Sequence, residues 1–203
     1  MTSAYGVIIA GGQGYRLGEV RKADLRIGGS KLIARVARVL GRLEQPLIVA
    51  TGPGDTRLDL GPQFVPVGDI EGFEGGPLAG LAAAVLILRS RGIVTGTLIS
   101  VAVDTPFLPT DYVERLLVGL NNAPAAFAGW HDAFYPPNAG WRLEAIADLP
   151  ERPGDTASLK ALHRQLGSVR IGWDAATENP FDNLNTLADL LTLGKRAQRA
   201  PRL

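Results

Sequence analysis

Short apolar runs alternate with longer amphipathic segments in the first 120 residues of the chain. Four runs have the length and bounding turn residues of buried strands, over residues 5–10, 46–51, 63–67 and 97–103. Apolar side chains recur at helical spacing over residues 31–43, 78–91 and 109–120. The pattern therefore predicts repeated units of a strand followed by a helix.

The predicted helices carry signals of their own. In the first, Leu32, Val36 and Leu40 share one face, and arginines stand between them. The helix near residue 110 has Thr110 as its expected N-cap, and acidic residues follow in its first turn, where they favour the helix dipole. We therefore expect this helix to begin at Thr110.

Strand and helix units of this kind, separated by Gly and Pro turns, predict an α/β fold with a mainly parallel sheet and helices on both faces. The second half is less regular and offers residues 123–128, residues 169–173 and a final helix from Thr186. There is no internal repeat and no clean domain boundary. We expect one domain over residues 1–194 and a basic, frayed tail over residues 195–203.

Composition narrows the class of protein. The chain has 203 residues, of which 46% are hydrophobic and 20% charged, values typical of a globular domain with a sizeable core. The net charge of +1 gives no reason to expect nucleic acid or an anionic membrane as a partner. The absence of cysteine excludes disulfides and thiolate metal sites. With no signal-peptide pattern and no long apolar run, the expected location is the cytoplasm.

A glycine-rich loop follows the first predicted strand and reads AGGQGYRLG over residues 10–18, with Lys22 four residues later. Glycines let backbone N–H groups approach a phosphate, and Arg16 and Lys22 can neutralise its charge. The spacing fits neither the dinucleotide fingerprint G-x-G-x-x-G nor the Walker A loop. A plain turn with two solvated cations is the alternative, but the order of strand, loop, arginine and lysine favours a polyphosphate site.

Two aspartates follow later strands. Asp104 ends the run over residues 97–103, and at the carboxyl end of a central strand a carboxylate can hold Mg²⁺ beside phosphates. Asp104 could instead cap its own turn before Pro106. Asp69 ends the run over residues 63–67, and the Gly-Gly-Pro sequence that follows introduces a helix whose first turn can approach a ligand.

The fourth informative segment reads NPFDNLNTLADL over residues 179–190. Asn185 or Thr186 has the character of a helix N-cap, with Asp189 as its capping-box partner. That structural role is compatible with Asn183 or Asn185 projecting into the site.

Together, these four segments resemble the molybdenum cofactor guanylyltransferase family, also called molybdopterin-guanine dinucleotide synthases, over about residues 6–191. The family's L-A-G-G-x-x-x-R-M-G-x-x-D-K motif is matched by Ile9, Ala10, Gly11, Gly12, Arg16, Leu17, Gly18 and Lys22. Its G-P-L-A-G is intact over residues 76–80, its D-T/A-P stands at residues 104–106, and its N-x-N-T-P-E-D-L is similar to residues 183–190. Four motifs in the right order are far more specific than any one of them.

The resemblance implies a Rossmann-like nucleotidyltransferase fold and a Mg²⁺-dependent transfer of GMP from GTP to the phosphate of molybdopterin. By position, the implied nucleotide-binding residues are Ile9, Ala10, Gly11, Gly12, Lys22, Asp69 and Asp104. Arg16, Lys22 and Asp104 would serve catalysis, and Asp104 would also bind the metal. Asn183 and Asn185 would face the acceptor. Transient contact with cofactor biosynthesis proteins or a molybdoenzyme chaperone is a further expectation, whereas nucleic acid and membranes are not expected partners.

The chain departs from the family pattern at Arg21, Asp24, Lys31, Ala50 and Pro136, where the family has an acidic residue, leucine, proline, asparagine and histidine, respectively. His131 lies near Pro136 in the sequence and could replace the missing histidine, although a lone surface histidine is the simpler interpretation. These departures leave two alternatives open. One is a related nucleotidyltransferase that uses CTP or a sugar phosphate, and the other is a non-catalytic homologue that binds nucleotide or cofactor.

Overall fold

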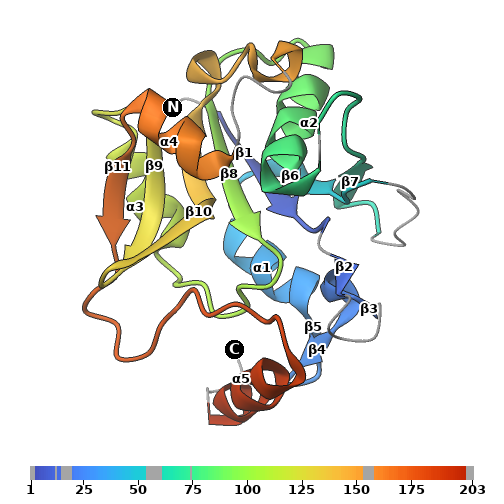
Figure 1. Ribbon diagram of the computed structural model, residues 1–203, viewed down its shortest axis with the longest axis vertical. Coiled ribbons are helices and arrows are strands. Elements are labelled where there is room, and N and C mark those ends of the chain that lie inside the picture. The colour runs from blue at the N-terminus through green and yellow to red at the C-terminus, as the bar shows by residue number, and fades with distance from the viewer. Residues whose placement is uncertain are drawn as a thin grey trace.

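Seven strands form the central sheet of the computed structural model, which describes residues 3–11, 13–14, 20–53, 61–73, 75–152 and 158–199. In spatial order they are β11 (Val169–Gly172), β9 (Ala125–Trp130), β10 (Ala133–Arg142), β8 (Thr97–Ala102), β1 (Ala4–Ile9), β6 (Glu44–Ala50) and β7 (Phe64–Val67). Strands β8, β1, β6 and β7 pair in parallel, as do β9 and β11, and β10 runs antiparallel to both of its neighbours (Figure 1). The predicted α/β fold with a mainly parallel sheet is confirmed.

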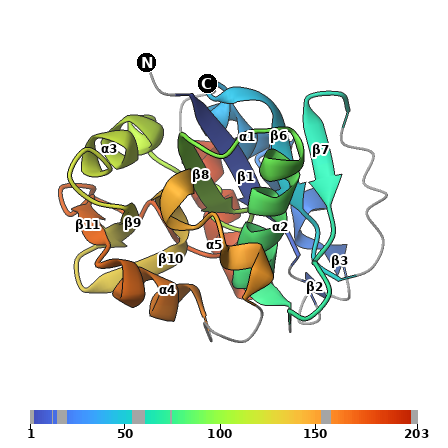
Figure 2. The ribbon, with the colours of Figure 1, turned by 90° about the horizontal axis from the view of Figure 1, so that it is seen from above.

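Helices cover both faces of the sheet, as the sequence predicts (Figure 2). Helices α1 (Leu32–Leu40) and α3 (Tyr112–Gly119) pack on one face, and α2 (Gly76–Ser90) and α4 (Leu159–Leu166) pack on the other. Because side chains alternate along a strand, β1 sends Ile8 into the first core and Val7 into the second. Both side chains are fully buried.

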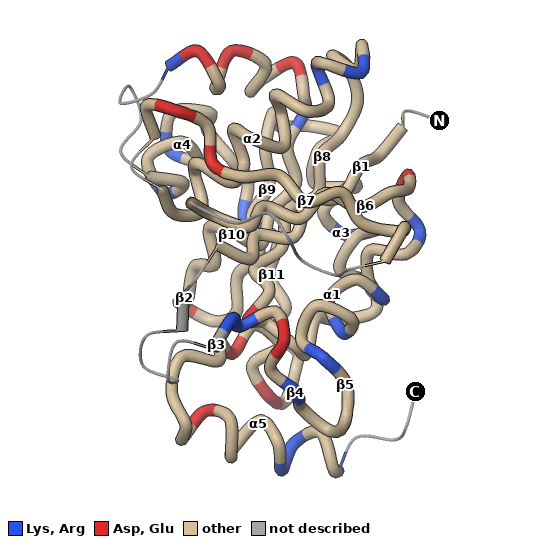
Figure 3. Tube along the Cα trace, turned by 90° about the vertical axis from the view of Figure 1, so that its right-hand side faces the viewer, with Lys and Arg blue, Asp and Glu red and all other residues tan. Residues whose placement is uncertain are grey.

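Smaller elements lie beyond the carboxyl edge of the sheet. Helix α5 (Leu187–Arg199) contacts β4 (Arg26–Ile27), which pairs with β5 (Ser30–Lys31), and β2 (Gln13–Gly14) pairs with β3 (Val20–Arg21). Figure 3 shows α5 at the foot of the molecule beside β4 and β5. Residues 195–199 belong to this helix, so the predicted tail boundary at residue 194 falls inside α5.

The predicted strands and helices of the first half are all present, with ends that differ by a few residues. The expected N-cap at Thr110 is wrong, because α3 begins at Tyr112 and Asp111 is the residue that precedes it. The Asp111 carboxylate does not cap the helix but accepts a hydrogen bond from Nε1 of Trp173 over 2.8 Å. This partner comes from beyond β11, which the local sequence around the helix could not reveal.

The capping box predicted at the start of α5 is confirmed. Oγ1 of Thr186 accepts a hydrogen bond from the backbone N–H of Asp189 over 3.2 Å. In return, Oδ2 of Asp189 accepts from the N–H groups of Thr186 and Asn185, over 2.8 and 2.9 Å. The reciprocal bonds satisfy donors that the first turn of a helix leaves free, and they fix the path of the chain just before α5.

Two elements of the second half were not predicted from the sequence pattern. Strand β10 contains Pro136 and Pro137, which argue against a strand, and the structure accommodates them in a register shift between Tyr135 and Ala139. The second is helix α4, which has only eight residues. Its ends do carry recognisable signals, because Ser158 caps the N-terminus and Gly167 follows the C-terminus in the left-handed conformation.

Candidate active site

Four neighbouring parallel strands bring their carboxyl ends to one edge of the sheet. In spatial order they are β8, β1, β6 and β7, and the chain that follows them includes Asp104, Gly11, Gly52 and Asp69, respectively. The backbone N–H of Asp69 donates to the carbonyl oxygen of Gly52 over 3.3 Å, which holds the two outer loops together. Ligands of open α/β sheets bind at this edge.

Close backbone packing explains two glycines at this edge. A Cβ atom on Gly11 would lie 2.7 Å from Cα of Gly52, closer than a real Cβ can approach a backbone atom. A Cβ atom on Gly80, in α2, would lie 2.9 Å from Cβ of Ala50. Any larger side chain would push these segments apart. The glycines therefore let the loop after β1 and the first turns of α2 pack against the end of β6.

The predicted nucleotide-binding residues of the first motif divide into two groups. Ile9, Ala10 and Gly11 are half-buried; Ile9 ends β1, and the other two follow it directly. The N–H of Ala10 donates to the carbonyl oxygen of Ala50 over 2.7 Å, which anchors the start of the loop to β6. Gly12 and Arg16 lie outside the described residues, so their predicted roles stay predictions.

Lys22 connects two segments that are far apart in the sequence. Its Nζ donates to Oδ2 of Asp104 and to Oδ1 of Asn185, each over 2.7 Å. The side chains of Lys22 and Asp104 are only 13% and 15% exposed, so water screens their ion pair less than it screens a surface pair. We call these three residues the Lys22 cluster. It places a cation, a carboxylate and an amide at the carboxyl edge of the sheet.

The turn after β8 leaves the Asp104 carboxylate available for this contact. Oγ1 of Thr105 closes the turn by donating to the carbonyl oxygen of Ala102 over 2.7 Å. Oδ1 of the buried Asn138 accepts from the N–H of Ala102 over 2.8 Å. Thus Thr105 and Asn138 stabilise the strand end, and the Asp104 side chain pairs with Lys22 instead of capping its own turn.

Backbone contacts bring the late segment to the same place. The N–H of Leu184 donates to the carbonyl oxygen of Asp104 over 3.0 Å, and the Leu184 side chain is fully buried. This anchor puts Asn185 beside Lys22. Asn183, on the other side of Leu184, is exposed and makes no hydrogen bond within the described residues. The structure therefore brings Asn185, but not Asn183, into contact with the predicted nucleotide side.

Asp69 carries a carboxylate with no hydrogen-bond partner in the part of the chain that the structure describes. The residue is half-buried, yet both of its oxygens are shielded from water and bond to none of the described residues. Burial raises the pKa of this carboxyl. Oδ2 lies against the Gly75–Gly76 turn, since a Cβ on Gly75 would be 3.6 Å from it. A shielded acceptor without donors is costly in free energy, and a ligand that brings N–H or O–H groups would relieve that cost.

Two of the departures from the family pattern compensate for each other. Nζ of Lys31 donates to Oδ1 of Asp24 over 2.6 Å, so the charges that replace a proline and a leucine form an ion pair. Both side chains are about two-fifths exposed, and the pair adds little stability. Its effect is positional, because it joins β5 to the short helix Lys22–Asp24 that carries Lys22.

The two histidines have different surroundings. His131 stands in the exposed turn between β9 and β10, with a φ of 47°, as expected of a lone surface histidine. His163 is buried on α4, where its Nε2 lies 3.0 Å from the carbonyl oxygen of Pro136 and its ring stacks on Trp141 at 4.3 Å. Burial lowers the pKa of His163 to about 4, despite the bond to Pro136, so the ring is neutral at physiological pH. The sequence analysis missed His163, although a histidine among the apolar residues of a short amphipathic helix was a signal.

A single carboxylate can serve as the protein's contribution to a magnesium site. Among the described residues, no group of three or more His, Cys, Asp or Glu side chains could hold a metal ion. Mg²⁺ in phosphate-transfer sites is commonly bound by one or two carboxylates, with phosphates and water completing its shell. Asp104, at a strand end and next to a lysine, fits that donor set.

The profile of the MobA-like NTP transferase domain matches residues 6–169 of the chain. The molybdenum cofactor guanylyltransferase of Rhodobacter capsulatus is 38% identical over 204 aligned residues, which cover 97% of this chain and 98% of that protein. The chain belongs to the MobA-like NTP transferase family. The molybdenum cofactor guanylyltransferase of Cereibacter sphaeroides is a further member, 34% identical over 92% of this chain and 93% of its own length. This family protein is accordingly a nucleotidyltransferase, and the resemblance inferred from the four motifs is confirmed.

Solved structures agree on the fold. Molybdopterin-guanine dinucleotide biosynthesis protein A from Archaeoglobus fulgidus superposes with a TM-score of 0.72 at 20% identity, covering 97% of this chain and all of that one. A 4-diphosphocytidyl-2C-methyl-D-erythritol synthase superposes with a TM-score of 0.70 at 14% identity, covering 96% and 98%. These identities are low, so the superpositions establish the Rossmann-like nucleotidyltransferase fold alone. In the part of the chain that the structure describes, no helix is long and apolar enough to cross a membrane.

Proposed function

We propose that this nucleotidyltransferase moves GMP from GTP to the phosphate of molybdopterin and releases pyrophosphate. The observation that carries the proposal is the Lys22 cluster, in which Lys22 bonds both to Asp104 and to Asn185. One of these partners belongs to the predicted nucleotide side and the other to the predicted acceptor side. The similarity to the guanylyltransferases of Rhodobacter capsulatus and Cereibacter sphaeroides supports GTP as the donor.

The proposal has the triphosphate lie along the loop after β1. Gly11 keeps the backbone of that loop close to the sheet edge, and Lys22 contributes a positive charge for the phosphates. When bound at Asp104, Mg²⁺ would neutralise and orient phosphate oxygens. Lys22 also pairs with Asp104 and balances its charge.

Asp69 is the candidate residue for selecting the base. Guanine presents two adjacent donors, N1–H and the 2-amino group, to one carboxylate, and the two oxygens of Asp69 are shielded and unpaired within the described residues. Adenine and cytosine each present an amino group next to an acceptor nitrogen, which would face one carboxylate oxygen without a proton between them. A site built to satisfy donors discriminates strongly against a ligand that leaves an acceptor unpaired.

The chemistry needs position and charge more than an acid or a base. An oxygen of the acceptor phosphate attacks the α-phosphorus of GTP and forms a new P–O bond. The bond from the α-phosphorus to the bridging oxygen breaks, and pyrophosphate leaves with the electron pair. The acceptor is already an anion, so no residue has to remove a proton from it. Lys22 offsets charge on the phosphates, and Asn185 can orient the acceptor through hydrogen bonds.

The decisive experiment measures pyrophosphate release from each of the four nucleoside triphosphates, with and without molybdopterin. Release should require Mg²⁺ and molybdopterin and should be fastest with GTP. Release that is fastest with CTP would replace the proposed donor, and release from GTP without molybdopterin would replace the acceptor. Binding of GTP and molybdopterin without any turnover would support a non-catalytic homologue.

Location and partners follow from the proposed reaction. Because the reaction consumes GTP, we place the enzyme in the cytoplasm, which fractionation of cells can test. The product is a cofactor that another protein must receive. We therefore expect transient contact with a molybdoenzyme chaperone or another protein of cofactor biosynthesis, to be tested by crosslinking in cells.

A further inference from the structure

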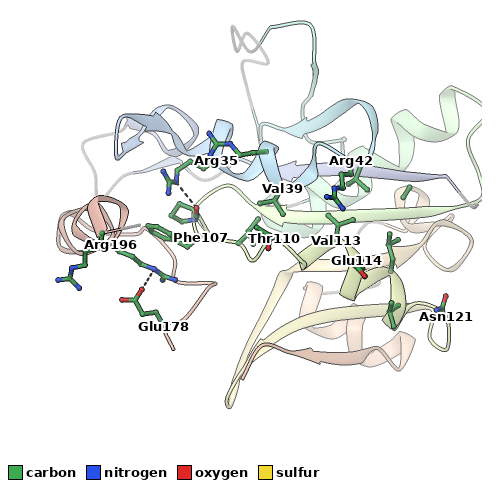
Figure 4. A pocket seen from close by; sticks show the side chains of 18 residues that line it. Arg35, Val39, Arg42, Phe107, Thr110, Val113, Glu114, Asn121, Glu178 and Arg196 are labelled. Atoms are coloured by element: carbon green, nitrogen blue, oxygen red, sulfur yellow. Dashed lines mark hydrogen bonds and ion pairs between the residues drawn. The ribbon is translucent and has the colours of Figure 1, made fainter. Parts of the chain in front are cut away.

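A large groove lies between α1, α3 and α5, and Figure 4 shows the side chains that line it. Its volume is about 990 Å³, and α1, α3, α5 and the loop after Asp104 contribute to its walls. We call it the arginine groove and define it by Arg35, Arg38, Arg42, Phe107, Val118 and Arg196. None of these residues was assigned a role by the sequence motifs.

Positive charge dominates the walls of the arginine groove. Five arginines line it, against the two glutamates Glu114 and Glu178. Glu178 is already paired with Arg196 over 2.9 Å. In contrast, Arg35, Arg38 and Arg42 form no ion pair with any carboxylate of the described residues. The wall formed by α1 and the turn after it therefore presents cations that have no anionic partner among the described residues.

The guanidinium groups at one end of the groove are held in place. The guanidinium carbon of Arg35 lies over the Phe107 ring, 5.1 Å from its centroid. The guanidinium carbon of Arg196 lies 4.3 Å from the same centroid. Arg35 also donates to the carbonyl oxygens of Pro106 and Ile27, each over 3.3 Å. Burial lowers the pKa of the Arg35 guanidinium, and the nearby charge of Arg38 lowers it further. An anion at this place would relieve that repulsion.

Apolar side chains lie between the charged walls. Val39 from α1 and Leu117 and Val118 from α3 line the groove, together with Phe107. Val118 is 62% exposed, so its side chain is available to a ligand in the groove. An apolar strip beside Arg35, Arg38 and Arg42, which form no ion pair within the described residues, is complementary to a ligand with an apolar face and acidic flanks.

We propose that the arginine groove binds an amphipathic helix of a partner protein, with apolar residues at helical spacing and acidic residues beside them. A helix laid into a groove buries an apolar stripe and leaves its flanks for ion pairs. Nucleic acid is disfavoured, because the chain has a net charge of only +1 and the centre of the groove is apolar. A small anion would satisfy one or two arginines and leave the apolar strip uncovered.

The location of the groove connects it to the candidate active site without being part of it. Phe107 follows Asp104 by three residues, and Arg196 belongs to α5, which begins two residues after Asn185. A helix bound in the groove would therefore contact the loop after Asp104 and the helix after Asn185, which adjoin two of the three members of the Lys22 cluster. The proposal does not require the reaction proposed above, because the groove residues contact none of the Lys22 cluster side chains through a hydrogen bond or ion pair among the described residues.

The test uses the full chain and a fluorescein-labelled designed peptide of about five helical turns, with leucines at three- and four-residue spacing and glutamates on both flanks. A peptide with the same composition in scrambled order and one with lysines in place of glutamates are the controls. Fluorescence anisotropy should show saturable binding of the designed peptide alone, and binding should weaken as the ionic strength rises.

Two protein variants locate the binding. Arg38→Gln/Arg42→Gln removes two unpaired charges, and Val118→Asp alters an exposed apolar side chain, so neither should disturb folding. Each should weaken binding at least about tenfold, which corresponds to about 1.4 kcal/mol. The matched control is Lys160→Gln/Arg164→Gln, which removes the same charge from the exposed face of α4 and should leave the affinity unchanged.

Several results would overturn the proposal. These are absence of binding, equal binding of the scrambled peptide, or an equal loss in the α4 variant. Tighter binding of a single-stranded RNA competitor would assign the groove to nucleic acid. A dimer that the groove variants dissociate in sedimentation would assign it to a second copy of the chain. Because GTP titration of the same variants should remain normal, failure here is distinguishable from failure of the proposed reaction.

Discussion

Replacing Asp104 by asparagine separates the two partners that compete for this carboxylate. In the structure, Oδ2 of Asp104 pairs with Nζ of Lys22 over 2.7 Å. In the proposed complex, the carboxylate holds Mg²⁺ and Lys22 turns to the triphosphate. Asp104→Asn keeps the size of the side chain and an oxygen that can accept from Lys22, but it removes the negative charge. The turn itself should persist, because Thr105 closes it.

The expected loss of stability is small. A hydrogen bond to a charged group contributes about 1.5–3 kcal/mol and a neutral one about 1 kcal/mol, so the exchange should lower the free energy of unfolding by roughly 1 kcal/mol. For a chain of this length, that corresponds to a fall in melting temperature of about 2–4 °C. Thermal unfolding monitored by circular dichroism measures it.

The effect on GTP binding should change sign with the metal. Without Mg²⁺, Asp104 repels the triphosphate and retains Lys22, so Asp104→Asn should bind GTP more tightly than the unmodified protein. With Mg²⁺, the variant lacks a metal ligand and should bind GTP more weakly. Calorimetric titrations in EDTA and in Mg²⁺ measure both affinities. Turnover with Mg²⁺ should fall by about 10²–10³, the range for loss of one preorganised electrostatic contact.

The change in the sign of the effect on GTP affinity between EDTA and Mg²⁺ is the most specific part of this prediction. Weaker binding in EDTA as well as in Mg²⁺ would mean that Asp104 acts on the nucleotide through the fold and not through charge. An unchanged rate of pyrophosphate release would remove Asp104 from the mechanism. A fall in melting temperature large enough to account for the lost activity would give the residue a structural role only. Asp111→Asn alters an aspartate that precedes α3 and accepts a hydrogen bond from Trp173, so it is a matched control and should leave GTP binding unchanged in both buffers.

Three further predictions follow from the geometry. Lys22→Ala should weaken GTP binding by about 1.5–3 kcal/mol, and an unchanged affinity in calorimetry would mean that Lys22 does not reach the phosphates. Asp69→Asn should weaken GTP binding but raise the melting temperature of the free protein at neutral pH. Burial raises the pKa of Asp69 above its usual 3.8, so the carboxylate of the unmodified protein becomes protonated as the pH falls toward its raised pKa. The gain in melting temperature should therefore shrink at low pH, and a gain that does not depend on pH would contradict the reasoning. The pKa of His163 falls from 6.5 to about 4, so the folded state binds fewer protons than the unfolded state between these values. The protein should lose up to about 3 kcal/mol of stability as the pH drops from 6.5 to 4, and His163→Gln should flatten this part of the stability profile measured by chemical denaturation.

Much of the fold was predictable because the strands of its core are short apolar runs in the sequence. Strands β1, β6 and β8 are apolar runs whose side chains are buried on both faces, and such runs are readable without knowledge of their neighbours. Strand β10 was not predictable in this way. Its prolines are tolerated only because a bulge removes them from the ladder, and Asn138 beside them uses its side chain to bond to the end of β8. Both compensations depend on the neighbouring strand.

Part of the candidate site was likewise predictable from the sequence, and part depends on contacts between distant segments. The rule that parallel strands share a carboxyl edge placed Asp69 and Asp104 correctly relative to the loop after β1. The contact between Lys22 and Asn185, 163 residues apart, needed more. It depends on how the chain crosses from β11 to α5 and on the bond between Leu184 and the backbone of Asp104. No local pattern in the sequence encodes that crossing.

The departures from the family pattern can now be judged by what they contact. Asp24 and Lys31 differ together and pair with each other, which keeps the hairpin attached to the short helix of Lys22. Ala50 lies where Gly80 packs against β6, so a small side chain suits the close approach of α2. Pro136 turns its carbonyl oxygen to His163 on α4. Each of these substitutions is accommodated in the packing around the edge, and none removes a group from the Lys22 cluster. For this reason these four departures argue less against a working transferase than the sequence alone suggests.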